Sequence, residues 1–321
     1  MLKQSIKQLF IFPHFRLFVL YLFSILLLPT YLAHAGTLTT VAGTGTAGYS
    51  GDTGPATSAM LKNPMGIAID GSNNLYVADL NNCRIRKITA STGIITTVAG
   101  DGTCNFSGDG GAATSAQIKF PFGVAVDGSG NLYIADSSNQ RIRKVDTSGN
   151  ISSIATSADV GVVEGIGVNS AGTKVYVADT WNNRVREWDS ATTTWTTIAG
   201  TGVAGFSGDG GAAISAQLNE PRGVVVDGAG NLYISDFYNS RIRKVDTSGI
   251  ISTFAGNGLA GWNGDGGAAT SAKIDNTRGL FIDGSGNLYF AAYSTNQIRK
   301  VTPSGIISTL VWEWFCRCGR E

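Results

Sequence analysis

The stretch GVAVDGSGNLYIADSSNQRIRKV at residues 123–145 decides the fold of this 321-residue chain, because it returns four more times. Each copy holds a short apolar run, a turn of small polar residues, a second apolar run and a charged segment. The other copies lie at 66–88, 165–188, 223–245 and 279–301. A unit that recurs along a whole chain predicts a repeat architecture in which each copy is one supersecondary unit.

Each copy predicts four antiparallel strands, which we name a to d. In the copy at 123–145, strand a is Val124–Val126, the turn DGSGN at 127–131 leads to strand b with the sequence LYIAD, and RIRKV forms strand c. A following run such as ISSIA supplies strand d. Asp, Gly and Asn tolerate tight hairpin turns. Repeated four-stranded units predict an all-β fold, a β-propeller whose sheets pack face to face.

The pattern G-[IV]-x-[VI]-D-x-x-G-N-L-Y-[VI]-A-D-x-x-N-x-R-I-R-K resembles the NHL repeat. Its five copies cover nearly the whole chain after the first 35 residues. The resemblance implies a β-propeller, usually of six blades, similar to those of bacterial exported NHL proteins and of teneurins. It also implies a binding module, since most such family members bind ligands and a minority are enzymes, notably the amidating lyases.

The first 35 residues differ from the rest of the chain. Three basic residues and no acidic one open the segment, an apolar run follows from Leu17 to Leu28, and Ala-His-Ala closes it at 33–35. This order is typical of a secretory signal peptide, residues 1–35. An uncleaved anchor is the alternative, although the run falls short of the ~20 residues that a spanning helix needs. We therefore expect a secreted, periplasmic or cell-surface protein without stable membrane insertion.

Cleavage after Ala35 would change the chemistry of the chain. It would remove three positive charges and no negative one, which takes the net charge from +1 to −2. It would also remove His14 and His34, the two histidines. Without histidine the mature protein has no imidazole for acid–base catalysis or zinc binding. Export and a negative charge also argue against a nucleic-acid partner.

The strand count at the two ends predicts an incomplete propeller. LTTVA at 38–42 matches a strand d that no strand a, b or c precedes, and the tail 311–321 matches no other copy. Read one base later, the codons of Trp312–Phe315 encode Gly, then Asn or Ser, then Gly, in register with Gly256–Gly258. We hypothesise that a frameshift removed a sixth blade. Residues 36–310 would then form five complete blades plus an orphan N-terminal strand of a truncated six-bladed propeller.

A Gly-rich insert precedes strand a in four copies and is missing from the third. The inserts lie at 42–61, 99–118, 199–218 and 255–274. Each holds one aspartate in the motif G-D-x-G: Asp52, Asp109, Asp209 and Asp265. A carboxylate with backbone carbonyls suggests a weak calcium site. The alternative, which one carboxylate per loop favours, is that the aspartate or the glycines after it cap the short helix that follows.

Strand b ends on aspartate in four copies, and an arginine follows five residues later. The predicted pairs are Asp79–Arg84, Asp136–Arg141, Asp179–Arg184 and Asp236–Arg241. The b–c hairpin would bring each pair together, and a charge-assisted hydrogen bond would fix the loop. A ring of charges that holds a ligand is the alternative. Repetition of one pair in several blades favours the structural role, and the fifth copy has Ala292 and Gln297 instead.

The loops between these pairs vary, and three of their residues are aromatic: Trp181, Phe237 and Tyr238. They share a face with the inserts, because strands b and d run in the same direction. Aromatic side chains on the loops of a rigid scaffold are typical binding anchors. Packing against the inserts is the alternative. We predict that this loop face binds a protein or carbohydrate ligand.

Two cysteines depart from the pattern of the copies. Cys83 and Cys104 take places that the other copies fill with small or polar residues. Both places belong to one blade and one face. In an oxidising compartment this predicts a disulfide between them; two free thiols are the alternative.

Little in the sequence favours an enzyme. Lactonase-like propellers hold calcium with acidic residues and Asn near their axis, and Glu164 is the one odd acidic residue expected in that region. It stands where the other copies have Met65, Phe122, Arg222 and Arg278. We therefore expect a non-enzymatic binding scaffold without a cofactor. A calcium-dependent lactonase-like or lyase-like propeller enzyme is the alternative.

Overall fold

The computed structural model describes residues 39–312. The predicted signal peptide, residues 1–35, and the tail beyond Trp312 lie outside the described residues. Within 39–312 the chain forms 20 strands and eight 3-10 helices of three residues each. No helix in this range is long and apolar enough to cross a membrane.

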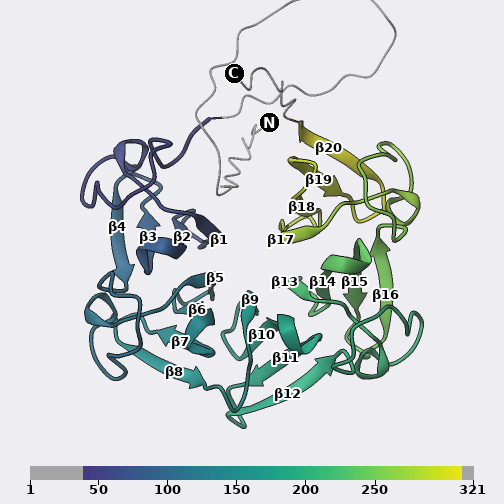
Figure 1. Cartoon of the computed structure of the whole chain (residues 1–321), viewed down its shortest axis with the longest axis horizontal. Helices are drawn as coiled ribbons and strands as arrows, with labels where there is room; N and C mark the ends of the chain where they lie inside the picture. The colour runs from purple at the N-terminus through teal and green to yellow at the C-terminus, as the bar shows by residue number, and fades with distance from the viewer. Residues whose placement is uncertain (1–38, 313–321) are drawn as a thin grey trace, which may run out of the picture. The chain divides into compact units, whose positions relative to one another are not determined.

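The strands form five four-stranded antiparallel sheets, each with its strands in chain order (Figure 1). These are the blades that the repeats predict, and the fold is an all-β propeller fold. Blade 1 consists of β1 (Pro64–Ile69), β2 (Leu75–Asp79), β3 (Arg84–Ile88) and β4 (Ile95–Ala99). Blade 2 consists of β5 (Pro121–Val126), β6 (Leu132–Asp136), β7 (Arg141–Val145) and β8 (Ile151–Ala155). Blade 3 consists of β9 (Val163–Val168), β10 (Lys174–Asp179), β11 (Arg184–Asp189) and β12 (Thr194–Ala199). Blade 4 consists of β13 (Pro221–Val226), β14 (Leu232–Asp236), β15 (Arg241–Val245) and β16 (Ile251–Ala255). Blade 5 consists of β17 (Thr277–Ile282), β18 (Leu288–Ala292), β19 (Gln297–Val301) and β20 (Ile307–Trp312).

The 3-10 helices lie between strands at two kinds of place. Four follow the inserts: η1 (Ala56–Ser58), η3 (Ala113–Ser115), η6 (Ala213–Ser215) and η8 (Ala269–Ser271). Four form the b–c turns of blades 1 to 4: η2 (Leu80–Asn82), η4 (Ser137–Asn139), η5 (Thr180–Asn182) and η7 (Phe237–Asn239).

The aspartate of the a–b turn, which is replaced by Asn169 in blade 3, explains why the repeat motif folds as it does. In blade 1, Oδ1 of Asp70 accepts hydrogen bonds from the backbone N–H groups of Ser72 and Asn74, both at 2.9 Å. Its Oδ2 accepts from Nδ2 of Asn74 at 2.8 Å and from the hydroxyl of Tyr76 at 3.1 Å. Such local side-chain hydrogen bonds are the reason that aspartate favours turns. The motif thus specifies the turn and anchors it to strand b.

The chain divides into two compact units, the first with most of blades 1 and 2 and the second with blades 3 to 5. In the first unit, Ile85 of blade 1 and Ile134 of blade 2 share one apolar core, and Ala113 and Ala116 of the intervening insert are buried in it. In the second unit, the core of blades 3 and 4 likewise contains Leu218 of an insert. The inserts therefore supply packing between neighbouring blades of each unit.

A glycine at the start of each repeat lets neighbouring strands a approach closely in the second unit. A Cβ on Gly165 of β9 would collide with the carbonyl oxygen of Arg222 on β13. A Cβ on Gly223 of β13 would collide in the same way with the carbonyl oxygen of Arg278 on β17. These contacts fix where β13 and β17 begin, and so where the two arginines stand.

The predicted orphan strand at 38–42 is not formed by its described residues, Thr39–Ala42. No neighbouring strand supplies backbone hydrogen bonds to them within 39–312, and a strand requires such a partner. Val41 and Ala42 instead pack with Leu61 and Val77 of the first unit. At the other end, β20 continues through Val311 and Trp312, the first two residues of the predicted tail.

Candidate functional site

The aspartate that ends strand b holds the b–c turn to the segment before strand a. In blade 1, Oδ1 of Asp79 accepts from the backbone N–H of Lys62 at 2.7 Å, and Oδ2 accepts from Nδ2 of Asn82 at 2.8 Å. Asp79 is completely buried, as are Asp136, Asp179 and Asp236. A buried carboxylate with these partners closes a loop and is not available to a ligand.

The prediction that this aspartate pairs with the first arginine of strand c is wrong in blades 1 and 4. The carboxylate pairs instead with the second arginine of strand c, and blade 2 has the same contact: Asp79–Arg86, Asp136–Arg143 and Asp236–Arg243, each at 3.4 Å. Arg84 lies over the ring of Tyr49, 3.7 Å from its centroid, and donates to the carbonyls of Asn82 and Asp101. Arg241 likewise donates to backbone carbonyls. Alternate residues of a strand face the same side, so the second arginine is also within reach.

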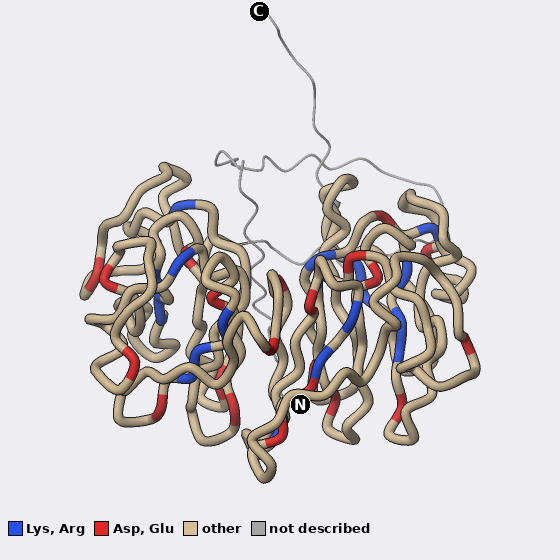
Figure 2. Tube along the Cα trace, turned by 60° about the horizontal axis from the view of Figure 1, so that its bottom comes forward, with Lys and Arg blue, Asp and Glu red and all other residues tan. Residues whose placement is uncertain are grey.

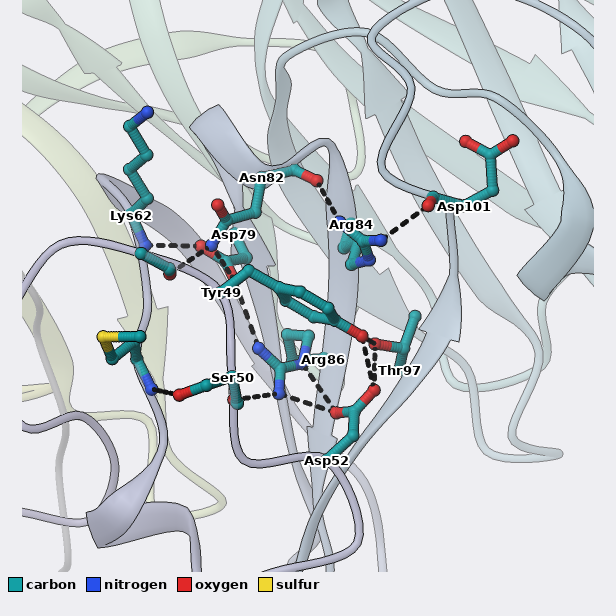
Figure 3. Close-up of polar contacts among 12 residues, drawn as sticks. Tyr49, Ser50, Asp52, Lys62, Asp79, Asn82, Arg84, Arg86, Thr97 and Asp101 are labelled. Carbon is teal, nitrogen blue, oxygen red and sulfur yellow. Dashed lines mark hydrogen bonds and ion pairs between the residues drawn. The ribbon is translucent and has the colours of Figure 1, made fainter.

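The second arginine also binds the aspartate of the insert, which is the aspartate predicted as a weak calcium ligand (Figure 3). The four ion pairs are Asp52–Arg86 at 2.6 Å, Asp109–Arg143 at 2.8 Å, Asp209–Arg243 at 2.7 Å and Asp265–Arg299 at 2.6 Å. These four arginine side chains are fully buried. An arginine at this distance disfavours a cation, and no group of three or more His, Cys, Asp or Glu that could hold a metal occurs within 39–312.

The capping alternative for the insert aspartates is wrong as well. None of the four 3-10 helices that follow the inserts receives a side-chain capping hydrogen bond. Oδ2 of Asp52 accepts instead from the hydroxyls of Thr97 on β4 and Tyr49, at 2.7 and 2.8 Å. Partial burial raises the pKa of Asp52, but these hydrogen bonds and the charge of Arg86 outweigh burial and lower it. The insert aspartate is a tether to strands c and d.

Cys83 and Cys104 form a disulfide, the pair that the comparison of copies predicts. Cys83 ends the b–c turn of blade 1, and Cys104 lies in the insert that leads to blade 2. The bond ties this turn to that insert within the first unit.

Blade 3, which lacks the insert, arranges its charges differently. Asp179 pairs with Arg184 as predicted, at 2.8 Å. Arg186, the second arginine, donates to the backbone carbonyls of Asp159 and Trp195. Burial and the neighbouring charge of Arg184 lower the pKa of Arg186. This arginine has no carboxylate within ion-pair distance among the described residues.

Two pockets flank the b–c turn of blade 3, and both are lined by Trp181, Asn182 and Arg184. The first has a volume of about 270 Å³ and extends over Thr197 and the segment 200–202. The second has a volume of about 310 Å³ and is bounded by the short loop 157–162, which stands in place of the insert. The indole of Trp181 is 68% exposed, as the sequence predicts.

Four further charged residues meet where the strands a of the second unit begin. Oε1 of Glu164 lies 3.5 Å from Nη1 of Arg222, and Oε2 lies 3.9 Å from Nη1 of Arg278. Arg222 also pairs with Glu220 at 2.8 Å. Burial raises the pKa of the Glu164 carboxyl and lowers that of the Arg278 guanidinium. Glu164 is therefore a paired residue and not a solvated lone acid.

Aromatic side chains surround this cluster, but not all of those predicted are exposed. Phe237 is only 4% exposed, because it packs inward with Arg222 3.9 Å above its ring, and the prediction that it is an exposed anchor is wrong. Tyr238 is 54% exposed, as predicted. Tyr293, which sequence reasoning did not choose, is 38% exposed and lies 4.7 Å from Arg278.

Figure 2 shows segments with Lys or Arg and segments with Asp or Glu scattered along the trace of each unit. This distribution agrees with the paired charges described above. The arginine cluster at Glu164 is thus distinguished by its geometry and not by a large excess of one charge.

The chain matches two family models. The model of the teneurin NHL domain matches residues 101–181 and 167–261, which together span half of the chain, and the model of the NHL repeat matches residues 61–88. Among curated proteins, human teneurin-1 is 28% identical over 61% of this chain and 8% of its own length. NHL repeat-containing protein 2 of Gallus gallus is 28% identical over 77% of this chain and 40% of its own length. The chain spans less than half the length of these relatives.

Solved structures show the same fold at low identity. A Bacteroides thetaiotaomicron protein of unknown function has a TM-score of 0.64 at 20% identity, over 84% of this chain and 63% of that one. A streptogramin B lyase has a TM-score of 0.50 at 13% identity, over 77% of this chain and 67% of that one. At these identities the likeness extends to the fold alone.

Proposed function

We propose that this chain, which belongs to the NHL-repeat family, is an exported, non-enzymatic binding module for a protein ligand. The contact surface is the loop face of its second unit, meaning the b–c turns of blades 3 to 5 and the starts of their strands a. Both the fold and the side chains on this face support the proposal.

The side chain of Arg278 is the observation that carries it. Its guanidinium makes no hydrogen bond with any residue in 39–312, its Nε is buried, and its nearest carboxylate oxygen is 3.9 Å away. The rings of Tyr293 and Phe237 lie 4.7 and 5.7 Å from it. A partly exposed guanidinium with free donors, held among aromatic rings, is suited to a carboxylate of the ligand.

The exposed aromatic residues supply the apolar part of the contact. Trp181, Tyr238 and Tyr293 are 68%, 54% and 38% exposed and lie on the b–c turns of three successive blades. Trp, Tyr and Arg are the residue types that dominate the energy of protein interfaces. A protein ligand can place an acidic side chain at Arg278 and apolar side chains on these rings. A neutral carbohydrate has no carboxylate, so a protein ligand fits this surface better.

Export is part of the proposal. The leader-like segment at 1–35 supports it, and so does the disulfide between Cys83 and Cys104, because such bonds persist in oxidising compartments. The protein would meet its ligand outside the cytoplasm.

A propeller enzyme is the second candidate, since the fold is shared with a streptogramin B lyase. Burial raises the pKa of the Glu164 carboxyl, which is the direction of shift that a general acid needs. For a calcium-dependent enzyme, residues 39–312 contain no group of three or more His, Cys, Asp or Glu that could hold the metal ion.

An array of peptides and an array of glycans, both probed with the full chain, test the proposal. We expect binding to peptides that combine Asp or Glu with aromatic or aliphatic residues. Arg278→Gln should weaken it about tenfold, the usual cost of a charge-assisted hydrogen bond. Arg84→Gln, which changes the first arginine of strand c of blade 1 in the first unit, is the matched control and should bind like the unmodified chain. Binding that Arg278→Gln leaves unchanged, or that occurs only on glycans, would contradict the proposal.

A further inference from the structure

Each of the four inserts pairs with the outer edge of its blade through backbone hydrogen bonds around an isolated antiparallel bridge. In blade 4, the N–H of Gly210 donates to the carbonyl of Ile251 at 2.8 Å, and the N–H of Ile251 donates to Gly211 at 3.0 Å. The N–H of Ala213 then donates to Gly249 at 2.8 Å. The same hydrogen bonds recur in blades 1, 2 and 5. The first residue of strand d, Ile251 in blade 4, is the receiving residue.

The side chains of the inserts bind the two arginines of strand c. In blade 4, Phe206 lies under the guanidinium of Arg241, 3.7 Å from it, and Asp209 forms the ion pair with Arg243. Blade 1 repeats this arrangement, with Arg84 over the ring of Tyr49 and Asp52 in an ion pair with Arg86. In these two blades the insert is therefore bound by three groups: the edge of strand d, the first arginine of strand c and the second arginine of strand c.

Blade 3 keeps all three receiving groups but has no insert. Trp195 corresponds to Ile251, because it faces Trp188 on β11 as Ile251 faces Val245 on β15. Outside the β11–β12 ladder, its backbone N–H makes no hydrogen bond within 39–312. Arg184 lines both pockets, whereas the corresponding arginines of blades 1 and 4 stack on an aromatic residue of the insert. Arg186 has a buried Nε without a partner among the described residues.

We propose that the outer edge of β12 binds an extended segment of a partner protein with the chemistry of the inserts, aromatic-[Ser/Asn]-Gly-Asp-x-Gly. Its backbone pairs with Trp195, its aromatic side chain enters the pockets between Trp181 and Arg184, and its carboxylate binds Arg186. Arg186 then leaves the carbonyl of Trp195, which becomes the acceptor for the segment's N–H. This is strand addition to a sheet edge, with affinity from the backbone and specificity from the side chains.

The chemistry of the segment that binds the edge of β12 can be inferred from the four inserts of this chain. Four copies of one motif sit on four equivalent edges, so the sequence that fits the fifth edge is known. The missing partner of Arg186 is a carboxylate, because its counterparts all hold one. This site shares Trp181 with the contact surface proposed above but does not involve Arg278 or Tyr293. Loss of peptide binding in Arg186→Gln but not in Arg278→Gln therefore distinguishes the two proposals.

The test uses an acetylated and amidated peptide with the sequence of residues 205–212, GFSGDGGA, labelled with fluorescein, and the full chain. Anisotropy should show saturable binding of one peptide per chain. A peptide with Asn for Asp, or Ala for Phe, should bind about tenfold more weakly. N-methylation of the glycine after Asp removes the donor to the strand edge and should abolish binding.

Variants of the chain locate the site. In Arg186→Gln, the Asp and Asn peptides should bind with equal affinity. In Arg184→Gln, the Phe and Ala peptides should bind with equal affinity. Arg241→Gln is the matched control in blade 4 and should change neither, and circular dichroism checks that every variant is folded. The proposal is overturned by absence of saturable binding or by an Arg186→Gln chain that still prefers Asp. Sedimentation that shows self-association through Arg186 would also overturn it, because the occupant would then be a second copy.

Discussion

Blades 3 and 4 share a strand order and a strand c of the type R-x-R, yet they neutralise their arginines in different ways. In blade 4, Arg243 is fully buried between Asp236 and Asp209. In blade 3, Arg186 is only half-buried and binds backbone carbonyls. Blade 3 forms its four-stranded sheet without the insert, so the sheet does not require it. The insert instead supplies the second counter-charge and covers the outer edge.

Removing the second arginine should have the largest effect, and it should differ between the two blades. Arg243→Gln leaves Asp236 buried without its cation and should cost about 3–5 kcal/mol of unfolding free energy. Arg186→Gln removes hydrogen bonds to carbonyls only and should cost about 1 kcal/mol. Urea unfolding followed by circular dichroism measures both. Equal losses would remove the distinction between the blades.

The disulfide extends the comparison to blade 1, since blade 4 has Ser240 and blade 5 has Ala260 at the two matching places. The double change Cys83→Ser with Cys104→Ala should cost about 3 kcal/mol, because the cross-link spans 21 residues. The loss should vanish when the unmodified chain is measured under reducing conditions. A persistent difference in reductant would mean that packing, and not the cross-link, causes it.

The two kinds of aspartate around the second arginine should respond to pH with opposite signs. Burial raises the pKa of Asp236 to about 6, in spite of its hydrogen bonds and the charge of Arg243. In the unfolded chain it titrates near ~3.9, so its contribution, up to about 3 kcal/mol, is full below that pH and is lost as pH rises through 6. Asp52 has a lowered pKa, so its contribution is present above the unfolded value and is lost as pH falls.

Carbon-13 NMR of the aspartate carboxyls checks these signs directly. The Asp236 signal should titrate near pH 6, and the Asp52 signal should titrate below the ordinary aspartate range. Two carboxyls that titrate together would show that burial does not separate their roles.

The smallest effect should come from the insert carboxylate itself, since it is partly exposed. Asp209→Asn should cost about 1 kcal/mol, because a partly solvated ion pair contributes little beyond its hydrogen bonds. A double-mutant cycle with Arg243→Gln should assign most of this loss to the pair. Independent, additive losses would argue that the aspartate acts through Thr253 alone, which also donates to it.

The fold could be predicted from the sequence because the repeat carries its own turn chemistry. Asp70 and Asn74 specify the a–b turn locally, so every copy predicts its own hairpin. The disulfide emerged because Cys83 and Cys104 were exceptions to a pattern. Local rules and comparison between copies sufficed for both.

The polar network could not be predicted because its partners are distant in sequence. Asp52 and Arg86 are brought together only when the insert folds back over strands c and d. The burial of Phe237 did leave a signal. Leu80 and Thr180 hold the same turn position and are buried too, whereas the next position, that of Trp181 and Tyr238, is exposed. Aligning the turns would have separated the two.

The attachment of each insert to its own blade has a consequence for competition. A tethered segment faces its edge at an effective concentration in the millimolar range or above, as for any short flexible linker. A free segment of the same sequence, at micromolar concentration, cannot displace it. The four edges that hold their own inserts are therefore inaccessible to a free segment of the same sequence. Such a segment binds only at the edge of β12, and no structural feature that repels it from the other blades is needed.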